Sequence, residues 1–315
     1  MPNLPRHFKE KGVLAFALWP LSLIWRLAAA ASRLRRPARA RVPVICVGNI
    51  VVGGTGKTPI VIALAKELQA RGLKVGVISR GYGAKVKAPR LARPEGAAGE
   101  LGDEPLLISR KLDGAPVAVC PNRAAAARLI ESEVDVILMD DGLQNRSLAK
   151  DFTIAVFDGG FGCGNGFLLP AGPLREPLSA LKRVNAIVIT GAENKALERR
   201  LARFGKVYAA PSQTAAPKIA RATAFAGIAR PEKFFLGLRA AGIRLTWTRA
   251  FPDHHRYSRE ELEEIVAIAR GEKILTTEKD FVKIPRELAA HFTPVGLSLQ
   301  IPPALLKSVI SSTGI

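Results

Sequence analysis

The sequence predicts an α/β protein built on a doubly wound, mostly parallel sheet. Apolar runs typical of strands alternate with helical stretches and occur at residues 43–50, 74–79, 116–120, 134–140, 152–158 and 185–190. Strands that are apolar throughout, rather than at every second residue, are typical of parallel sheets covered on both faces. After the first strand, residues 57–71 predict an amphipathic helix that ends at Gly72, and its apolar face comprises Ile60, Val61, Leu64, Ala65 and Leu68.

A second, smaller α/β domain is expected after residue 210. Residues 210–218 are rich in small, polar and proline residues and are typical of a linker. A new alternation follows, with a strand near 217–227, helices at 231–242 and 259–271, and strands at 243–251 and 273–277. We therefore divide the chain into an N-terminal helix with a basic flank (1–41), a larger domain (42–210) and a smaller domain (211–315), with the active site expected between the two domains.

Composition narrows the classes of partner. The chain has 47 Lys and Arg against 27 Asp and Glu, a net charge of +20, which predicts attraction to nucleic acid, anionic phospholipid or phosphorylated substrates. Aromatic residues are only 6% and no known nucleic-acid-binding module is found, so we expect no nucleic-acid partner. Three scattered cysteines cannot form a disulfide framework or a zinc site, which fits a reducing cytosol.

A glycine-rich turn, VVGGTGKT at residues 51–58, lies between the first predicted strand and helix. This context predicts a P-loop NTPase-like fold that binds ATP, with backbone amides from Gly53 to Gly56, including Gly54 and Thr55, around the phosphates. Lys57 would supply charge to the β and γ phosphates, and Thr58 would ligate Mg²⁺. The usual motif has glycine where this chain has Val51, so an ordinary glycine-rich turn is the alternative interpretation.

The N-terminal segment predicts a membrane-associated helix. Residues 13–31 are apolar over nearly the ~20 residues that span a bilayer, and the basic cluster Arg33, Arg35, Arg36, Arg39 and Arg41 follows. Pro20 and Arg26 interrupt the apolar run, so we favour a helix lying in the inner leaflet over a true span or a buried core helix. A secretory signal is a further alternative, but export would separate the P-loop from ATP.

Five further polar residues are candidates for chemistry. Asp140 and Asp141 end a buried strand; because successive side chains point to opposite faces, we assign Asp140 to the metal and Asp141 to a neighbouring or substrate role. Capping of the turn before Gly142 is the alternative. Asp103 in LGDEP could equally begin a helix. His254 and His255 are adjacent and lack a third ligand at a zinc-motif spacing, so a packed or solvated histidine pair competes with a functional one.

The ordered set of motifs resembles the tetraacyldisaccharide 4′-kinase family, which makes a lipid A precursor. The motifs are VGNIVVGGTGKTP, SRGYG, LGDEP, PNR, DDGLQN, PAGPLRE, GIARPEKF, FPDHHRYS and TTEKD, and they cover nearly the whole chain. The resemblance implies a membrane-bound P-loop kinase that uses Mg²⁺ and moves the ATP γ-phosphate to the 4′-hydroxyl of a tetraacylated glucosamine disaccharide 1-phosphate. It also implies the cytoplasmic face of the bacterial inner membrane, as a peripheral or monotopic protein among anionic lipids; we infer no obligate protein partner.

The resemblance also implies residue roles. Asp103 matches the catalytic aspartate and His254 its partner, and a carboxylate oriented by an imidazole can accept the proton of a sugar hydroxyl. Between the two histidines we expect the first, His254, to be the partner. Asp141 and Arg175 are expected to join catalysis, and the remaining nucleotide-site residues are Arg123, Gln144, Glu176 and Tyr82. A membrane-associated P-loop ATPase with a regulatory or chaperone role is the main rival, although it would not need the DHH sequence in a second domain.

Overall fold

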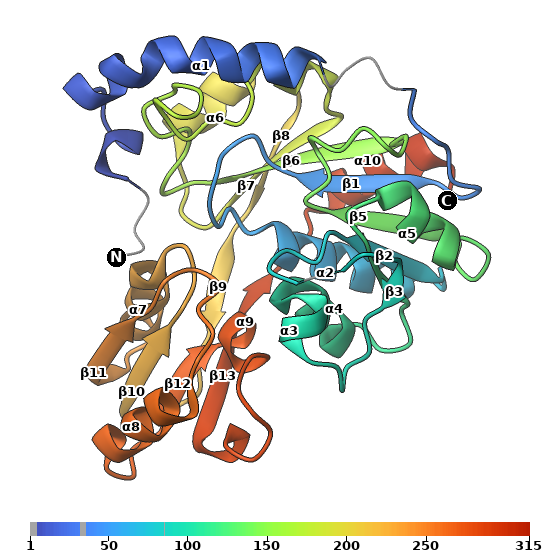
Figure 1. Cartoon of the computed structure of the whole chain (residues 1–315). Coiled ribbons are helices and arrows are strands. Elements are labelled where there is room, and N and C mark those ends of the chain that lie inside the picture. The colour runs from blue at the N-terminus through green and yellow to red at the C-terminus, as the bar shows by residue number, and fades with distance from the viewer. Residues whose placement is uncertain (1–4, 32–35, 85) are drawn as a thin grey trace.

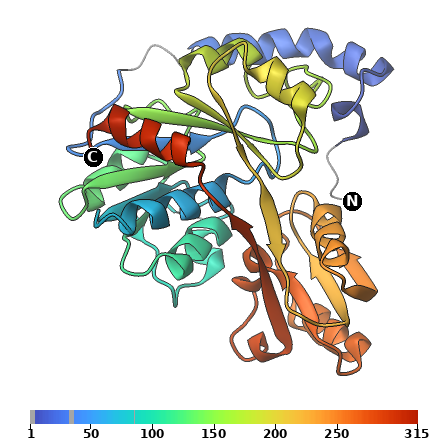
Figure 2. The same cartoon turned by 180° about the vertical axis from the view of Figure 1, so that it is seen from behind.

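The computed structural model describes residues 5–31, 36–84 and 86–315 and contains two sheets, each with helices packed on it (Figures 1 and 2). The larger sheet has the order β3-β4-β2-β5-β1-β6-β7-β8, and its neighbouring strands are parallel except for the pair β3 and β4. Its strands are β1 (Val44–Gly48), β2 (Val75–Ser79), β3 (Arg90–Leu91), β4 (Val117–Val119), β5 (Val136–Asp140), β6 (Phe152–Asp158), β7 (Ala186–Thr190) and β8 (Val207–Ala210). The doubly wound, mostly parallel sheet is as predicted.

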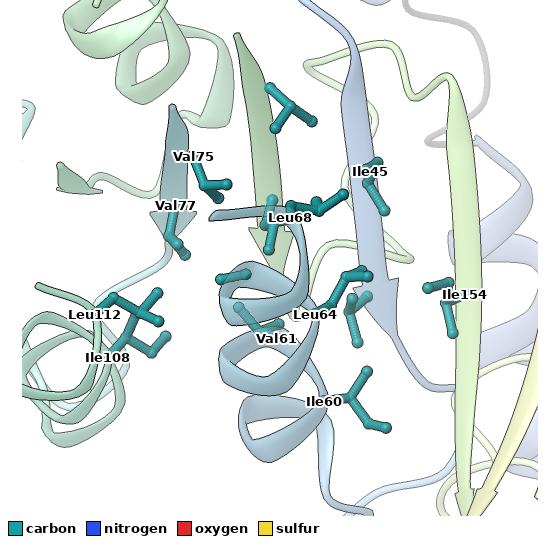
Figure 3. Close-up of a cluster of buried hydrophobic side chains, with 14 of the residues drawn as sticks. Ile45, Ile60, Val61, Leu64, Leu68, Val75, Val77, Ile108, Leu112 and Ile154 are labelled. Atoms are coloured by element: carbon teal, nitrogen blue, oxygen red, sulfur yellow. The ribbon is translucent and has the colours of Figure 1, made fainter. Parts of the chain in front are cut away.

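Helix α2 (Lys57–Gln69) shows why the large sheet forms. Its buried face contains the residues expected from the sequence, and Ile60, Val61, Leu64 and Leu68 lie against the strands in Figure 3. The same core includes Ile108 of α4, so one hydrophobic layer joins the two helices to the sheet. The remaining helices of this sheet unit are α3 (Ala98–Leu101), α4 (Asp103–Lys111), α5 (Arg123–Ile130), the 3₁₀ helix Leu178–Arg183 and α6 (Lys195–Leu201).

The smaller sheet has the order β11-β10-β12-β13-β9. Its elements are β9 (Ser212–Ala215), β10 (Arg221–Ala226), α7 (Pro231–Ala240), β11 (Arg244–Ala250), α8 (Arg259–Ala269), β12 (Ile274–Thr277), α9 (Glu278–Phe281), the 3₁₀ helix Ala289–His291 and β13 (Phe292–Leu299). Part of the expected linker, residues 210–218, is a strand rather than a loop. β9 pairs antiparallel with β13, and this long-range pairing, which the local composition does not encode, makes it the edge strand.

The chain crosses between the sheets twice, once from β8 to β9 and once from β13 to α10 (Pro303–Thr313), as Figure 2 shows. Leu305, Leu306 and Val309 of α10 pack in the core of the large sheet. The last helix of the expected C-terminal segment, 211–315, therefore covers the large sheet. The boundaries proposed at 42–210 and 211–315 stay predictions.

Helix α1 (Val13–Ala31), after the 3₁₀ helix Arg6–Phe8, lies along the surface of the large sheet unit (Figure 1). Ser22 Oγ donates to Leu168 O at 2.9 Å and anchors it. Its outward side chains are 47–90% exposed, which is inconsistent with a buried core helix, and they are Val13, Leu14, Phe16, Trp19, Leu21, Leu23 and Ile24. Among the residues that the structure describes, no helix is long and apolar enough to cross a bilayer. Arg33 and Arg35 of the basic cluster lie outside the described residues.

Candidate active site

The glycine-rich loop connects β1 to α2 at the carboxyl edge of the large sheet. Gly53 and Gly56 have φ values of 100° and 86°, which side chains rarely adopt, so glycine is needed at both positions. Two hydrogen bonds hold Thr55 between them: Asn49 Nδ2 donates to its Oγ1 at 3.0 Å, and Thr190 Oγ1 donates to its carbonyl at 2.9 Å. The loop thus leads into the amino end of α2, where unpaired amides favour an anion.

Val51, the departure from the usual motif, has a packing explanation. It is fully buried and forms an antiparallel bridge with Leu174. Two backbone hydrogen bonds extend this contact, from Val52 N to Pro173 O at 2.9 Å and from Arg175 N to Ile50 O at 2.7 Å. A valine fills the core there and ties the loop to the segment that carries Arg175.

The side chains of the acidic pair at the end of β5 point in different directions, as expected for successive residues of a strand. Asp140 is buried, and Thr58 Oγ1 donates to its Oδ2 at 3.5 Å. Asp141 turns away with a φ of 47° and lies 3.6 Å from Lys57 Nζ and 3.4 Å from Arg175 NH1. Thr58, the other predicted metal ligand, thus lies beside Asp140, and the cations Lys57 and Arg175 lie beside Asp141.

The two carboxyls differ in charge state. Burial, together with the charges of Glu104 and Asp141, raises the pKa of Asp140 to about 7. Burial acts in the same direction on Asp141, but the charges of Lys57 and Arg175 outweigh it and hold the pKa of Asp141 below its usual value. Asp141 therefore stays ionised at neutral pH, whereas Asp140 gains a proton easily unless a cation is near.

Three other predicted nucleotide-site residues contact protein groups around this loop. Arg123 is 2% exposed and donates to Cys120 O at 2.9 Å and to Asp140 O at 3.4 Å, directly behind the acidic pair. Gln144 Nε2 donates to Asn49 O at 2.8 Å and to Glu176 Oε1 at 3.1 Å, and Glu176 also pairs with Arg183. These contacts brace the strand ends that carry the loop.

Asp103 and His254 meet across the two sheet units. Asp103 is the first residue of α4, and its Oδ2 lies 2.8 Å from His254 Nδ1. His254 has a φ of 59°, and the ring of Tyr82 lies 4.8 Å from its imidazole. The neighbouring His255 instead pairs with Glu261 at 2.9 Å. The structure therefore places His254, but not His255, beside Asp103, with Tyr82 on the imidazole of His254.

The charge state of Asp103 follows from these neighbours. Burial raises the pKa of Asp103, but the hydrogen bond from His254 and the charge of Lys279 more than offset it, so the pKa lies below the usual value. The adjacent residue, Glu104, contributes negative charge that helps to raise the pKa of Asp140.

Sequence reasoning missed three residues that join the site. Arg230 NH2 donates to Gly54 O at 2.8 Å and, with Lys233, pairs with the buried Asp158 at the end of β6. Lys279 lies 3.3 Å from His254 Nε2. Arg230 and Lys233 belong to GIARPEKF and Lys279 to TTEKD, so the motifs themselves were the signal, although no local pattern assigned these residues a contact.

Comparison with known proteins agrees with this geometry. A model of the family described as Tetraacyldisaccharide-1-P 4′-kinase matches residues 14–313. The chain belongs to the tetraacyldisaccharide 4′-kinase family. It is therefore a phosphotransferase, a kinase of lipid A biosynthesis.

Relatives match over most of their length. The tetraacyldisaccharide 4′-kinase of Methylobacterium sp. (strain 4-46) is 47% identical over 86% of this chain and 85% of its own. That of Aeromonas hydrophila is 40% identical over 99% and 96%. A crystal structure of LpxK from Aquifex aeolicus in complex with ATP superposes with a TM-score of 0.74 at 26% identity, covering 96% of this chain and all of the other. The two-sheet arrangement is thus the arrangement of this kinase family.

Proposed function

We propose that this kinase transfers the γ-phosphate of ATP to the 4′-hydroxyl of a tetraacyldisaccharide 1-phosphate, with Asp103 and His254 as a general-base dyad. The observation that carries the proposal is the 2.8 Å contact between Asp103 Oδ2 and His254 Nδ1, which joins the P-loop unit to the smaller sheet. A sugar hydroxyl is a weak nucleophile, so a carboxylate that takes its proton during attack lowers the barrier.

The residues around the P-loop divide the remaining tasks. Lys57 and the amides of residues 53–57 bind the β and γ phosphates. Arg175 lies 3.4 Å from Asp141. Its planar guanidinium can stabilise the negative charge that develops on the oxygens of the transferred phosphoryl group. The hydroxyl oxygen attacks phosphorus as the bond to the β,γ-bridging oxygen breaks, Asp103 takes the proton, and ADP leaves.

Thr58 and Asp140 fit a Mg²⁺ ion. Asp140 Oδ1 is buried and, within the described residues, has no hydrogen-bond partner, while Oδ2 lies 3.5 Å from the Thr58 hydroxyl. Mg²⁺ usually binds one or two protein oxygens together with water and phosphate, and it supplies positive charge to the phosphate oxygens when bound. A hydroxyl beside an unpaired carboxylate oxygen is that kind of donor set.

Helix α1 supports a peripheral or monotopic position at the cytoplasmic face of the inner membrane. Its exposed apolar side chains include Phe16, Trp19 and Ile24, and the basic residues Arg36, Arg39 and Arg41 follow the helix. An apolar helix face beside positive charge suits the boundary of an anionic bilayer. A substrate with four acyl chains would be met there without leaving the membrane.

The experiment is an assay of the purified full-length enzyme in detergent, with labelled ATP and the tetraacyldisaccharide 1-phosphate. We expect label in the lipid, and Asp103→Asn should lower kcat roughly 100-fold or more while ATP binding survives. Asp113→Asn, an exposed aspartate, is the matched control. Near-normal turnover by the Asp103 variant would refute the dyad. ATP hydrolysis at the same rate with and without the lipid would favour a regulatory ATPase.

A further inference from the structure

The TTEKD sequence, residues 276–280, forms a rigid turn in the smaller sheet unit. Thr277 caps α9, and its hydroxyl contacts Asp280 through both the backbone amide, at 3.1 Å, and the carboxylate, at 2.6 Å. The fully buried Asp280 also accepts hydrogen bonds from Gly227 N and Tyr257 OH, both at 2.9 Å. Lys279 lies between Thr277 and Asp280, so its side chain extends from a backbone that has little freedom to move.

Lys279 reaches the Asp103–His254 pair from this turn. Its Nζ lies 3.3 Å from His254 Nε2, 3.2 Å from Glu104 Oε1 and 3.4 Å from Asp253 Oδ1, and its side chain is 19% exposed. Burial alone would lower the pKa of Lys279, but the carboxylates of Glu104, Asp253 and Asp103 raise it above its ordinary value. The amine is therefore a permanent ammonium at this position.

An ammonium constrains the imidazole that it faces. Lysine donates hydrogen bonds and cannot accept them, so a ring nitrogen at 3.3 Å must present its lone pair. The proton of the neutral ring is then on Nδ1, where it is donated to Asp103 Oδ2 at 2.8 Å. A proton on Nε2 would instead bring two hydrogen-bond donors against each other.

The other groups around the ring do not reverse this preference. Asp253 Oδ2 would favour a proton on Nε2, but it lies 3.8 Å away, beyond hydrogen-bond range, and its Oδ1 is on Lys279. Tyr82 packs beside the imidazole at a centroid distance of 4.8 Å. Lys283 lies on Asp280 at 2.7 Å and adds positive charge toward Asp103.

We propose that Lys279 is a positioning residue that fixes the tautomer of His254 with the proton on Nδ1, so that the imidazole holds Asp103 as an ionised, oriented base. This inference rests on the proposed function. Asp103 Oδ2 is fixed by His254, and Oδ1 is the oxygen that takes the proton of the sugar hydroxyl. Lys279 does not contact the reacting atoms; it acts through His254.

The test combines kinetics with the ¹⁵N spectrum of the histidine rings in the full-length enzyme in detergent. The chain has only four histidines, so His254→Gln identifies the signals of His254. In the native enzyme we expect two widely separated ring signals, with the proton coupled to Nδ1. In Lys279→Met, Nε2 loses the donor that faces it, so the ring proton is no longer held on Nδ1 and the two signals should move together.

The kinetic effect should follow the proton. Lys279→Met should lower kcat about 10-fold to 100-fold with the KM for ATP within about twofold, because only the base is affected. Lys279→Arg retains a cationic donor and should restore most of the rate and the native ¹⁵N pattern. Lys273→Met, an exposed lysine of the same sheet unit, is the control and should match the native enzyme.

Three results would overturn the proposal. The first is a native enzyme whose His254 proton lies on Nε2. The second is an unchanged ¹⁵N pattern in Lys279→Met, whatever its rate. The third is a loss of kcat in Lys279→Arg equal to that in Lys279→Met although the Arg variant keeps the native ¹⁵N pattern, which would mean a purely structural role. If Lys279→Met does not fold, the proposal is still tested by the position of the His254 proton in the native spectrum and by the rate and spectrum of Lys279→Arg. Failure of the dyad itself is detected separately, by normal turnover of Asp103→Asn.

Discussion

Asp158 at the end of β6 joins the two sheet units, and its removal gives a prediction that the structure allows to be worked through. The carboxylate is 2% exposed and pairs with Arg230 at 2.7 Å and Lys233 at 2.6 Å, both from the smaller unit. It also accepts hydrogen bonds from the backbone amides of Gly160 and Phe161, at 2.9 and 3.0 Å. Asp158→Asn keeps the shape and removes the charge.

The magnitude follows from the pKa. Burial raises the pKa of Asp158, but the hydrogen bonds and charges of Arg230 and Lys233 outweigh it and bring the pKa from 3.8 to about 2. A shift of about 1.8 pH units corresponds to about 2.5 kcal/mol of folding stability at pH 7. Because the pKa is lower in the folded state, this stability is complete well above pH 4 and is lost as the pH falls toward 2.

The assay is urea unfolding of the native enzyme and of Asp158→Asn at pH 7 and pH 3. The variant should be less stable at pH 7 by about 2.5 kcal/mol or more, since two cations also lose their partner. The difference between the two proteins should shrink by about 1 kcal/mol at pH 3. Glu193→Gln, which removes an exposed ion pair with Lys195, should leave the midpoint unchanged. A difference that is the same at both pH values would refute the reasoning.

Three further predictions concern the core, the membrane surface and the metal site. Leu64→Ala, at the centre of the core under α2, should lower the free energy of unfolding by about 2.7–5 kcal/mol in urea unfolding; a loss below about 1 kcal/mol would contradict the packing. Trp19→Glu combined with Leu23→Glu should weaken flotation with anionic vesicles while ATP binding is kept, and unchanged flotation would reject α1 as the contact. Asp140→Asn should raise the Mg²⁺ concentration for half-maximal rate at least about 10-fold, and an unchanged requirement would exclude Asp140 as a ligand.

The sequence alone predicted the parts that depend on local chemistry. Continuous apolar runs predicted strands β1, β2 and β4 to β7 of the large sheet, and helical periodicity predicted the buried face of α2, because each segment carries these patterns within itself. Strands β3 and β8 were not predicted. The turn before α2 was also predictable, because positive φ values at Gly53 and Gly56 need residues without a side chain. The ordered motifs identified the family, and the family model matches the chain over residues 14–313.

Tertiary structure decided what depends on residues far apart in the chain. The pairing of Asp103 with His254 joins positions separated by 151 residues. The resemblance predicted this pair, but it is the folded positions of the two sheets that bring His254 to Asp103 and place its neighbour on Glu261. Strand β9 forms because it pairs antiparallel with β13. Helix α10 covers the large sheet because Leu305 and Val309 pack in the core of that sheet. The contacts of Arg230 with Gly54 and of Lys279 with Glu104 likewise cross between the units. Local patterns carry the preference of a segment for helix, strand or turn, whereas the partner of a buried charge is set by packing over the whole chain.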